Sequence, residues 1–310
     1  MAASATRTAS REARVAEAVA TGPLGALSHD ALGVIFDGLA DPLQPVVAVA
    51  LSSTCLGLRT PLQAALEVLQ ERHARAVALC RKVSYGSCEG RRLRSCAELL
   101  CADGLFWDKK GLTTDDMATL GMILRTNGLP RLQRLVLLCN DFGDAGVQAL
   151  CAGLGPGSAP ALFTLNLLRT GFGPPGAEAL AAALRSGAMP NLGAVVLGGN
   201  PIGNQGMAAL AAPLRTIPAL VVLNLAQCGI GDEGVASLLG DLGKEDFMNL
   251  KQLHLEDNTI TDVGVARLAA AIDTGGLPTL QWLTAALLGN PASDVAVHAV
   301  KDALAKRSSQ

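Results

Sequence analysis

A leucine pattern that recurs every 28 to 30 residues is the feature that most constrains how this chain can fold. Six leucines open the repeated units, namely Leu132, Leu162, Leu192, Leu220, Leu250 and Leu280. Each of the first five units continues as L-x-x-L-x-L-x-x-N, with Val195 in place of one leucine and Thr170 or Cys228 in place of two of the asparagines. Self-similarity at such a period is typical of solenoids, in which each unit contacts only its neighbours.

Within one unit the spacing of the leucines changes from that of a strand to that of a helix. Alternation, as at Leu135 and Leu137, predicts a short strand with one buried face. Leucines four apart, as at Leu150 and Leu154, predict a helix of about three turns, which we expect an Asp or Asn such as Asp144 to cap. One unit cannot bury both its strand face and its helix stripe, whereas stacked units can. We expect the asparagine amides to satisfy backbone groups where each strand ends.

The pattern extends to both ends of this region. A degenerate first unit is formed by Leu105, Trp107, Lys110, Leu112, Leu120 and Leu124. In the last unit Asn290 lies ten residues after Leu280 instead of eight. Either Trp282 takes the first position of that unit, or the strand bulges by two residues. A final helix over about 293–306 would close the solenoid with a solvated face.

These motifs resemble the leucine-rich repeat family, and the unit length resembles its ribonuclease-inhibitor-like subtype. The resemblance covers residues 100–306 and implies an α/β fold: a leucine-rich-repeat solenoid shaped as a horseshoe arc, with a parallel sheet on the concave face and helices on the convex face. We expect three segments: a tail at 1–26 that is disordered or forms a short helix, a small all-α region at 27–100, and about seven repeats at 101–310.

The region before the repeats shows helical spacing without strands. Leu32, Ile35, Phe36 and Leu39 form one stripe of one helix, and Leu43 follows. The run LSHDALGVIFDGL, together with ALSSTCLGLR at 50–59, resembles an F-box, although Ser28 replaces the usual proline and the usual tryptophan is absent. The resemblance implies that these five apolar residues bind the Skp adaptor of a cullin ubiquitin ligase. The alternative is a helical cap that packs on the first repeat.

Side chains between and just after the strand leucines should face the concave surface, where we expect a protein or peptide partner. The main candidates are Phe106, Arg134, Val136, Leu138, Asn166, Leu168, Arg169, Val196, Asn224, His254 and Glu256. Val136, Leu138, Leu168 and Val196 should form a contiguous apolar strip. The alternative is that this strip packs against the chain's own N-terminal region or consists of small residues that the surface tolerates.

Composition and motifs argue against several other function classes. The net charge of −2 gives no basic footprint for nucleic acid or a membrane surface. None of the eight cysteines forms a C-x-x-C pair, so we expect reduced thiols in the cytoplasm, with the nucleus as the alternative, and no metal or other cofactor. Two G-x-G-x-x-G runs, at 171–176 and 229–234, coincide with the turn of the repeat, so they do not indicate a dinucleotide site.

No constellation of residues predicts catalysis, so we expect a non-enzymatic recognition protein. The adjacent acids Asp115 and Asp116 suit a helix start. An F-box-like segment followed by leucine-rich repeats implies a substrate receptor of a cullin ubiquitin ligase. Two alternatives stay open. The repeats also resemble the GTPase-activating protein of Ran, a regulator of small GTPases, but this chain ends in KRSSQ instead of an acidic tail. A generic scaffold is the other.

Overall fold

The computed structural model describes residues 41–46, 48–49, 56–83, 95–240, 242–243, 245–281, 283 and 287–308, and the chain divides into two compact units, Met1–Cys80 and Arg81–Gln310. The long helix α4 (Leu56–Val83) ends just inside the second unit. The second unit continues with η1 (Cys96–Cys101), β1 (Gly104–Phe106), α5 (Thr114–Thr126), β2 (Arg134–Val136), α6 (Gly143–Cys151), β3 (Thr164–Asn166), α7 (Pro174–Arg185), β4 (Ala194–Val196), α8 (Gly203–Arg215), β5 (Val222–Asn224), α9 (Asp232–Leu239), β6 (Gln252–His254), α10 (Asp262–Asp273) and α11 (Asp294–Ser308).

The repeats of the second unit build one parallel sheet whose strands follow the order of the sequence, from β1 to β6. The register pairs Leu135 with Leu165, and Leu165 with Val195, so equivalent positions of successive repeats lie side by side. In β2 to β6 the central residue is buried and the residues on either side are partly exposed. The alternating leucines therefore form short strands with one buried face, as predicted, and the architecture fits a leucine-rich-repeat solenoid.

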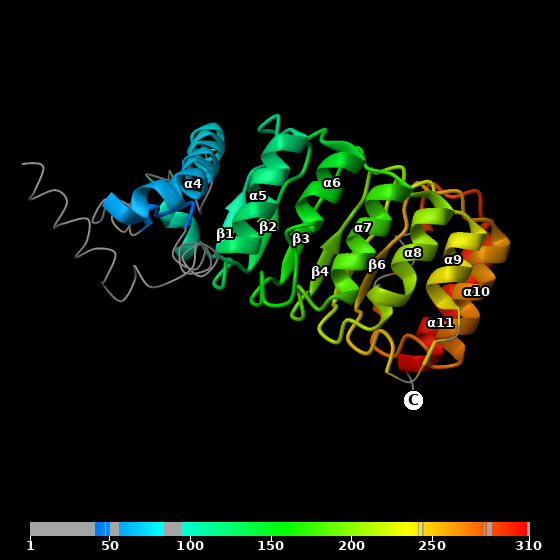
Figure 1. Ribbon diagram of the computed structural model, residues 1–310. Coiled ribbons are helices and arrows are strands. Elements are labelled where there is room, and N and C mark those ends of the chain that lie inside the picture. The colour runs from blue at the N-terminus through cyan, green and yellow to red at the C-terminus, as the bar shows by residue number, and fades with distance from the viewer. Residues whose placement is uncertain are drawn as a thin grey trace, which may run out of the picture. The chain divides into compact units, whose positions relative to one another are not determined.

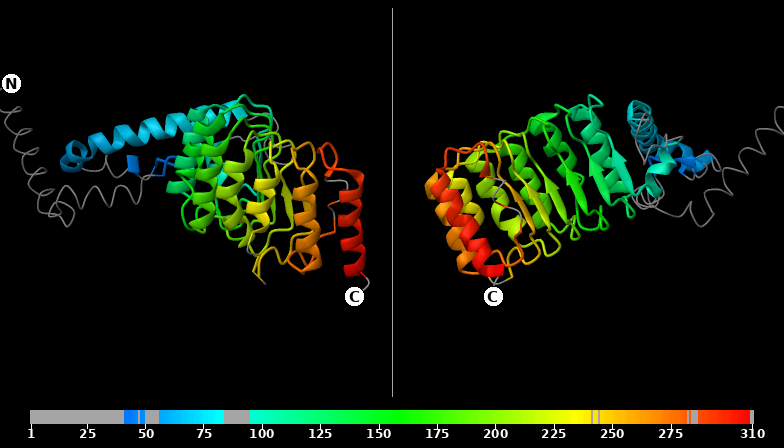
Figure 2. Two further views of the ribbon diagram at one scale, coloured as in Figure 1. Left: turned by 90° about the vertical axis from the view of Figure 1, so that its right-hand side faces the viewer. Right: turned by 180° about the vertical axis from the view of Figure 1, so that it is seen from behind.

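The helices α5 to α10 lie side by side and cover one face of this sheet (Figure 1). Viewed from behind, the strands lie in front of these helices (Figure 2). The apolar stripe of each helix closes the core against the sheet, as Leu150 of α6 and Leu180 of α7 illustrate, each 1% exposed. We call the side of the sheet that α5 to α10 leave uncovered the open face.

The asparagine of the repeat links neighbouring units through its buried amide. In Asn200 the oxygen Oδ1 accepts hydrogen bonds from the backbone N–H groups of Thr170 and Gly171, both at 2.8 Å. The Nδ2 group donates to the carbonyl oxygens of Leu167 at 2.8 Å and Leu197 at 2.6 Å. One side chain therefore satisfies backbone groups of two repeats, as predicted, at a bend where unpaired groups would be buried.

Thr170 and Cys228 fill the same position with smaller side chains. The hydroxyl of Thr170 donates to the carbonyl oxygen of Leu167 at 3.0 Å. The Sγ atom of Cys228 lies 3.5 Å from the carbonyl oxygen of Leu197. Burial raises the pKa of the Cys228 thiol to about 12, so the thiol stays protonated at neutral pH and can donate. Both substitutes therefore keep the donor function that the asparagine has at this position.

An Asp or Asn lies four residues after the asparagine position of most repeats. Its side chain caps the helix of the following repeat, whereas the sequence had led us to expect that it caps the helix of the same repeat. Because α6 begins at Gly143, Asp144 already lies in the first turn, and its side chain points to the next unit. Its Oδ1 atom accepts from the backbone N–H groups of Gly173 at 2.7 Å and Gly176 at 2.8 Å, at the start of α7. This position thus links repeats in the same way as the asparagine.

Asn204 repeats the arrangement at the start of α9, where it accepts from Gly231 at 2.7 Å and Gly234 at 3.1 Å. These are glycines of the G-x-G-x-x-G runs, so their N–H groups, which a pyrophosphate would need, bind a side chain of the preceding repeat. Where Pro174 occupies the capping position, α8 begins differently, and the N–H of Gly203 donates to the carbonyl oxygen of Cys228 at 2.9 Å. The glycines therefore serve the turn of the repeat.

The last repeat keeps Leu280 in its first position. The N–H of Leu280 donates to the carbonyl oxygen of Leu277, and the N–H of Gln281 donates to the carbonyl oxygen of Lys251. The N–H groups of residues 250 and 251 make the equivalent bonds one repeat earlier. Asn290 still donates to Leu287 and accepts from the N–H of residue 260. The two additional residues consequently fall between 281 and 287, which agrees with the second of our two alternatives. Trp282 itself lies outside the described residues.

The helix α11 closes the C-terminal end of the repeats (Figure 2). Arg307, in its last turn, donates to the carbonyl oxygens of Leu277 and Leu280. The buried residues Val300 and Ala303 form its inner side. This agrees with the terminal cap that the sequence predicts.

Candidate functional site

The open face presents the side chains on either side of each buried strand residue. The strand register places six of them in one row across the sheet: Phe106, Val136, Asn166, Val196, Asn224 and His254. Arg134 lies in the row before it, and Leu138, Leu168 and Glu256 lie two residues beyond it. All of these residues are partly exposed. The residues that the sequence places on the concave surface therefore share one face.

The apolar side chains form an arc around Asn166 and not the contiguous strip that we had expected. Val136 and Val196 flank Asn166 in the row, so the two valines are not neighbours. Leu138 and Leu168 are neighbours, because the residue after Leu138 donates its N–H to the carbonyl oxygen of Leu168 at 2.8 Å. The Asn166 side chain folds back and accepts from the N–H of Leu168 at 3.0 Å. We call Val136, Leu138, Leu168 and Val196 the apolar patch.

Arg134 stacks on an aromatic ring at the edge of the apolar patch. Its guanidinium carbon lies 5.3 Å from the ring centroid of Phe106, within the range of a cation–π contact. The Phe106 ring folds back over Gly104, where a Cβ atom would lie 2.7 Å from the ring carbon Cε2. Gly104 therefore permits the stack, which holds an arginine on the open face.

A row of left-handed residues borders the open face where the strands end. Its members, one from each repeat, are Lys109, Cys139, Arg169, Gly199, Gln227, Asp257 and Gly289, with φ between 52° and 74°. Arg169 Nη2 donates to Gln227 Oε1 at 3.2 Å, and Gln227 Nε2 donates to Asp257 Oδ2 at 3.0 Å. Gly199 lies between Arg169 and Gln227 in this row. Gln227 and Gly199 could not be singled out from the sequence, because their role depends on residues one and two repeats away.

An imidazole and a carboxylate pair at the C-terminal part of the open face. His254 Nδ1 lies 3.0 Å from Glu256 Oε1, and both side chains are about 30% exposed. The other oxygen, Glu256 Oε2, is buried and has no hydrogen-bond donor in the part of the chain that the structure describes. Asp257 follows directly on the exposed edge. This end of the open face is therefore acidic.

Most of the predicted adaptor-binding residues, namely Leu32, Ile35, Phe36 and Leu39, lie outside the described residues. Leu43 lies within them and is 4% exposed. Its N–H donates to Asp41 Oδ1 at 2.7 Å, and the carbonyl oxygen of Pro42 lies 2.7 Å from His73 Nδ1 of α4. The segment around Leu43 is thus attached to α4 within the first unit.

Asp116 serves a helix start, as predicted. Thr113 and Asp116 form a reciprocal capping box at the N-terminus of α5, and Lys82 donates to Asp116 Oδ2 at 2.5 Å. Burial raises the pKa of Asp116, but the hydrogen bonds from Lys82 and Thr113 and the charge of Lys82 together lower it by more. The pKa therefore lies below its usual value.

In the described ranges no group of three or more His, Cys, Asp or Glu side chains could hold a metal ion.

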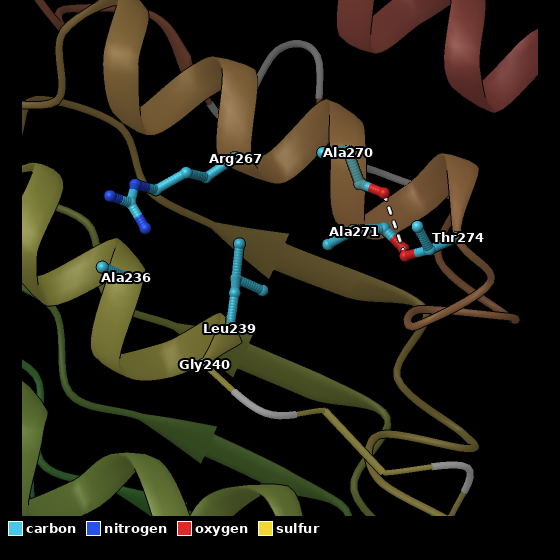
Figure 3. A pocket seen from close by; sticks show the side chains of 7 residues that line it. All are labelled: Ala236, Leu239, Gly240, Arg267, Ala270, Ala271 and Thr274. Carbon is cyan, nitrogen blue, oxygen red and sulfur yellow. Dashed lines mark hydrogen bonds between the residues drawn. The ribbon is translucent and has the colours of Figure 1, made fainter.

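A pocket of about 240 Å³ lies between α9 and α10, on the side of the sheet away from the open face (Figure 3). Its lining consists of Ala236, Leu239, Gly240, Arg267, Ala270, Ala271 and Thr274. The Thr274 hydroxyl donates to the carbonyl oxygens of Ala270 and Ala271. The pocket arises because α9 ends at Leu239 and is shorter than α10. Its lining offers no carboxylate, imidazole or thiol for chemistry.

Comparison with known proteins agrees with this geometry. Four segments of the chain, residues 130–151, 188–211, 218–239 and 248–269, match the Leucine Rich repeat family. Each segment begins before a strand and ends in the following helix. No curated protein matches the chain. None of the helices in the described part of the chain has the length and apolar character needed to cross a membrane.

Proposed function

We propose that this chain of leucine-rich repeats is a non-catalytic substrate receptor. The open face would hold a protein target, and the F-box-like segment would attach that target to the Skp adaptor of a cullin ubiquitin ligase. The leucine-rich repeats indicate a protein-interaction module. The observation that carries the proposal is the apolar patch: four partly exposed aliphatic side chains on a face that α5 to α10 leave uncovered.

The chemistry of the open face fits a protein target. An apolar centre with charged and amide side chains around it is typical of protein interfaces, in which a few central contacts supply most of the affinity. The strands are braced by buried amides such as Asn200, so the face is held in one shape before a target arrives. Rigid presentation lowers the entropic cost of binding.

The ligase arm of the proposal is supported by the sequence at 27–59, which resembles an F-box. A receptor of this kind acts by proximity, because it holds its target close to the enzyme that modifies it. The six cysteines that the structure describes are free thiols, which supports a reducing compartment such as the cytoplasm.

A comparative capture experiment tests the recognition arm. The full chain and the variant Leu138→Glu/Leu168→Glu are used as baits in a cell extract, with Val263→Glu/Val295→Glu as the matched control. Val263 and Val295 are 57% and 80% exposed at the starts of α10 and α11, away from the apolar patch. We expect proteins that the wild type and the control retain and the patch variant loses. Equal retention by all three baits would contradict a target site on the open face.

Co-elution with a purified Skp adaptor on size exclusion tests the ligase arm. We expect the wild type to form a complex that the variant Ile35→Asp/Phe36→Asp does not form. If the wild type forms no complex, the N-terminal region is a cap of the solenoid, and a recognition protein without a ligase link remains.

The alternative function, regulation of a small GTPase, predicts a different result. Purified chain would then accelerate GTP hydrolysis by the GTPase Ran. The amides of Asn140, Asn200 and Asn258 are buried and hydrogen-bonded to backbone, which favours a structural role for these three residues. Our proposal predicts no acceleration.

A further inference from the structure

The apolar patch lies beside a cationic group. Leu168 belongs to the patch, and Arg169 follows it directly. The N–H of Arg169 donates to the carbonyl oxygen of Gly198 at 2.9 Å, which fixes its backbone against the next repeat. Its side chain is exposed and crosses Gly199 to reach Gln227. The guanidinium is thus held over the exposed edge of the sheet, next to aliphatic side chains.

Arg169 has spare capacity for an anion. A guanidinium carries five N–H donors, and the bond to Gln227 Oε1 uses one of them. Among the residues that the structure describes, no carboxylate pairs with Arg169. A carboxylate of a partner could therefore accept two parallel hydrogen bonds from it.

Charge is unevenly distributed along the open face and its left-handed border. In the first three repeats these positions carry three basic side chains, those of Lys109, Arg134 and Arg169, and one acidic side chain, that of Asp108. In the next three repeats they carry two acidic side chains, those of Glu256 and Asp257, and no Lys or Arg. The surface therefore favours an acidic group near its first half and a basic group near its second half.

The spacing between the two halves sets the length of chain that could use both. Three strand-to-strand steps separate Leu168 from Glu256, which corresponds to about 14 Å at about 4.8 Å per step. An extended peptide rises about 3.3 Å per residue, so about four residues cover this distance. A short segment of one protein is therefore long enough to reach from the apolar patch at Leu168 to Glu256.

We infer that the partner presents an extended peptide segment in which an aliphatic residue stands next to an aspartate or glutamate. A lysine or arginine lies about four residues from the aliphatic residue. The aliphatic side chain packs on the apolar patch, the carboxylate binds Arg169, and the basic side chain lies near Glu256 and Asp257. This inference rests on the proposed function of the open face and adds the chemistry of the partner.

Selection from a library of random 12-residue peptides displayed on phage tests this inference. The immobilised full chain is compared with Leu138→Glu/Leu168→Glu and Arg169→Glu, and with Arg131→Glu as the matched control. Arg131 is an exposed arginine in the turn before β2. The thermal unfolding curve of each variant shows whether it is folded. We expect the wild type and the control to enrich peptides with an aliphatic–acidic pair that the other two variants do not retain.

A synthetic peptide from the enriched pool then gives the decisive comparison by fluorescence anisotropy. Arg169→Glu should raise its dissociation constant by about tenfold, and exchange of the peptide's acid for lysine should restore binding to this variant. Peptides that need the apolar patch but show no preference for an acid, or bind Arg169→Glu equally well, would overturn the inference and leave the proposed function intact. If no enriched peptide depends on Leu138 and Leu168, the proposed function itself is contradicted.

Discussion

Arg169 donates a hydrogen bond to Gln227 across an entire repeat, with the two residues 58 positions apart in the sequence. The bond is possible because the repeat between them carries Gly199 at the equivalent position, with φ of +69°. A Cβ atom on Gly199 would lie 2.5 Å from Cγ of Arg169. The absence of a side chain at Gly199 therefore allows Arg169 of the preceding repeat to reach Gln227 of the following repeat.

Gly199→Ala should destabilise the fold by more than a backbone effect alone. A left-handed φ costs an alanine about 1 kcal/mol, and here the new methyl group would also displace the Arg169 side chain. Gly229→Ala is the matched control, because Gly229 has φ of +68° and a methyl group there would meet no other atom within 4 Å. Urea unfolding should show the larger loss at position 199. Equal losses in the two variants would mean that the crossing of Arg169 contributes nothing.

Asn200→Ala should be among the most damaging single changes in the repeats. It removes six hydrogen bonds, five of them to backbone groups, and leaves buried backbone groups of two repeats unpaired, which should cost about 3 kcal/mol. Asn191→Ala removes one bond of an exposed amide, to the carbonyl oxygen of Pro160, and should cost less than about 1 kcal/mol. Denaturant unfolding of both variants checks the ranking, and a similar loss in both would contradict the role that we assign to the buried amides.

Asp232 should make the stability of the repeats depend on pH. Burial raises its pKa, but the hydrogen bonds from Thr261 and Gly264 and the charge of Arg267 together lower it by more. The folded-state pKa therefore lies below its usual value. The stabilisation is complete above the unfolded-state pKa and is lost as the pH falls through the lower folded-state pKa. Asn204, which accepts the same pair of N–H bonds one repeat earlier, shows that an amide can replace the carboxylate.

The test is Asp232→Asn, with unfolding free energies measured from about pH 7 down to about pH 3. At neutral pH the wild type should be the more stable protein. The difference between the two proteins should shrink as the pH falls, because only the wild type loses the charged form. A difference that stays constant over this range would contradict our assignment of the pH dependence to Asp232.

The same substitution should destabilise the fold strongly at Leu167 and only slightly at Leu168. Leu167 is 1% exposed in the core, so Leu167→Glu buries a charge and should unfold the domain or cost more than about 3 kcal/mol. Leu168 lies partly exposed on the open face, so Leu168→Glu should change the free energy of unfolding by about 1 kcal/mol or less. Circular dichroism melts distinguish the two. A large loss for Leu168→Glu would place this residue in the core and not on a binding surface.

The strands and helices could be predicted from the sequence because one unit contains both periods. Leu135 and Leu137 alternate as a strand requires, and Leu150 and Leu154 recur as a helix requires, so each unit specifies its own elements. The links between units could not be predicted in the same way. The cap that Asp144 forms on α7 and the bond from Arg169 to Gln227 depend on how residues about 30 or 60 positions apart are brought together by the stacking of repeats.

The candidate site was predicted as a face but not in its detail. Period-two alternation places Val136, Leu138, Leu168 and Val196 on one side of the sheet. The strand register then decides that Asn166 lies between the two valines, and the sequence of a single repeat does not contain this information. The last repeat shows the same limit, since only the hydrogen bonds of Leu280 and Asn290 locate its two additional residues.

Photo-crosslinking from single positions tests the central claim, that the open face holds a protein target, most directly. A benzophenone amino acid is placed at Val196 on the open face or, in a matched protein, at Ala212, which is exposed on α8. After irradiation in a cell extract, we predict a discrete crosslinked protein from position 196 and none from position 212. Crosslinks from position 212 alone, or the same products from both positions, would contradict the account.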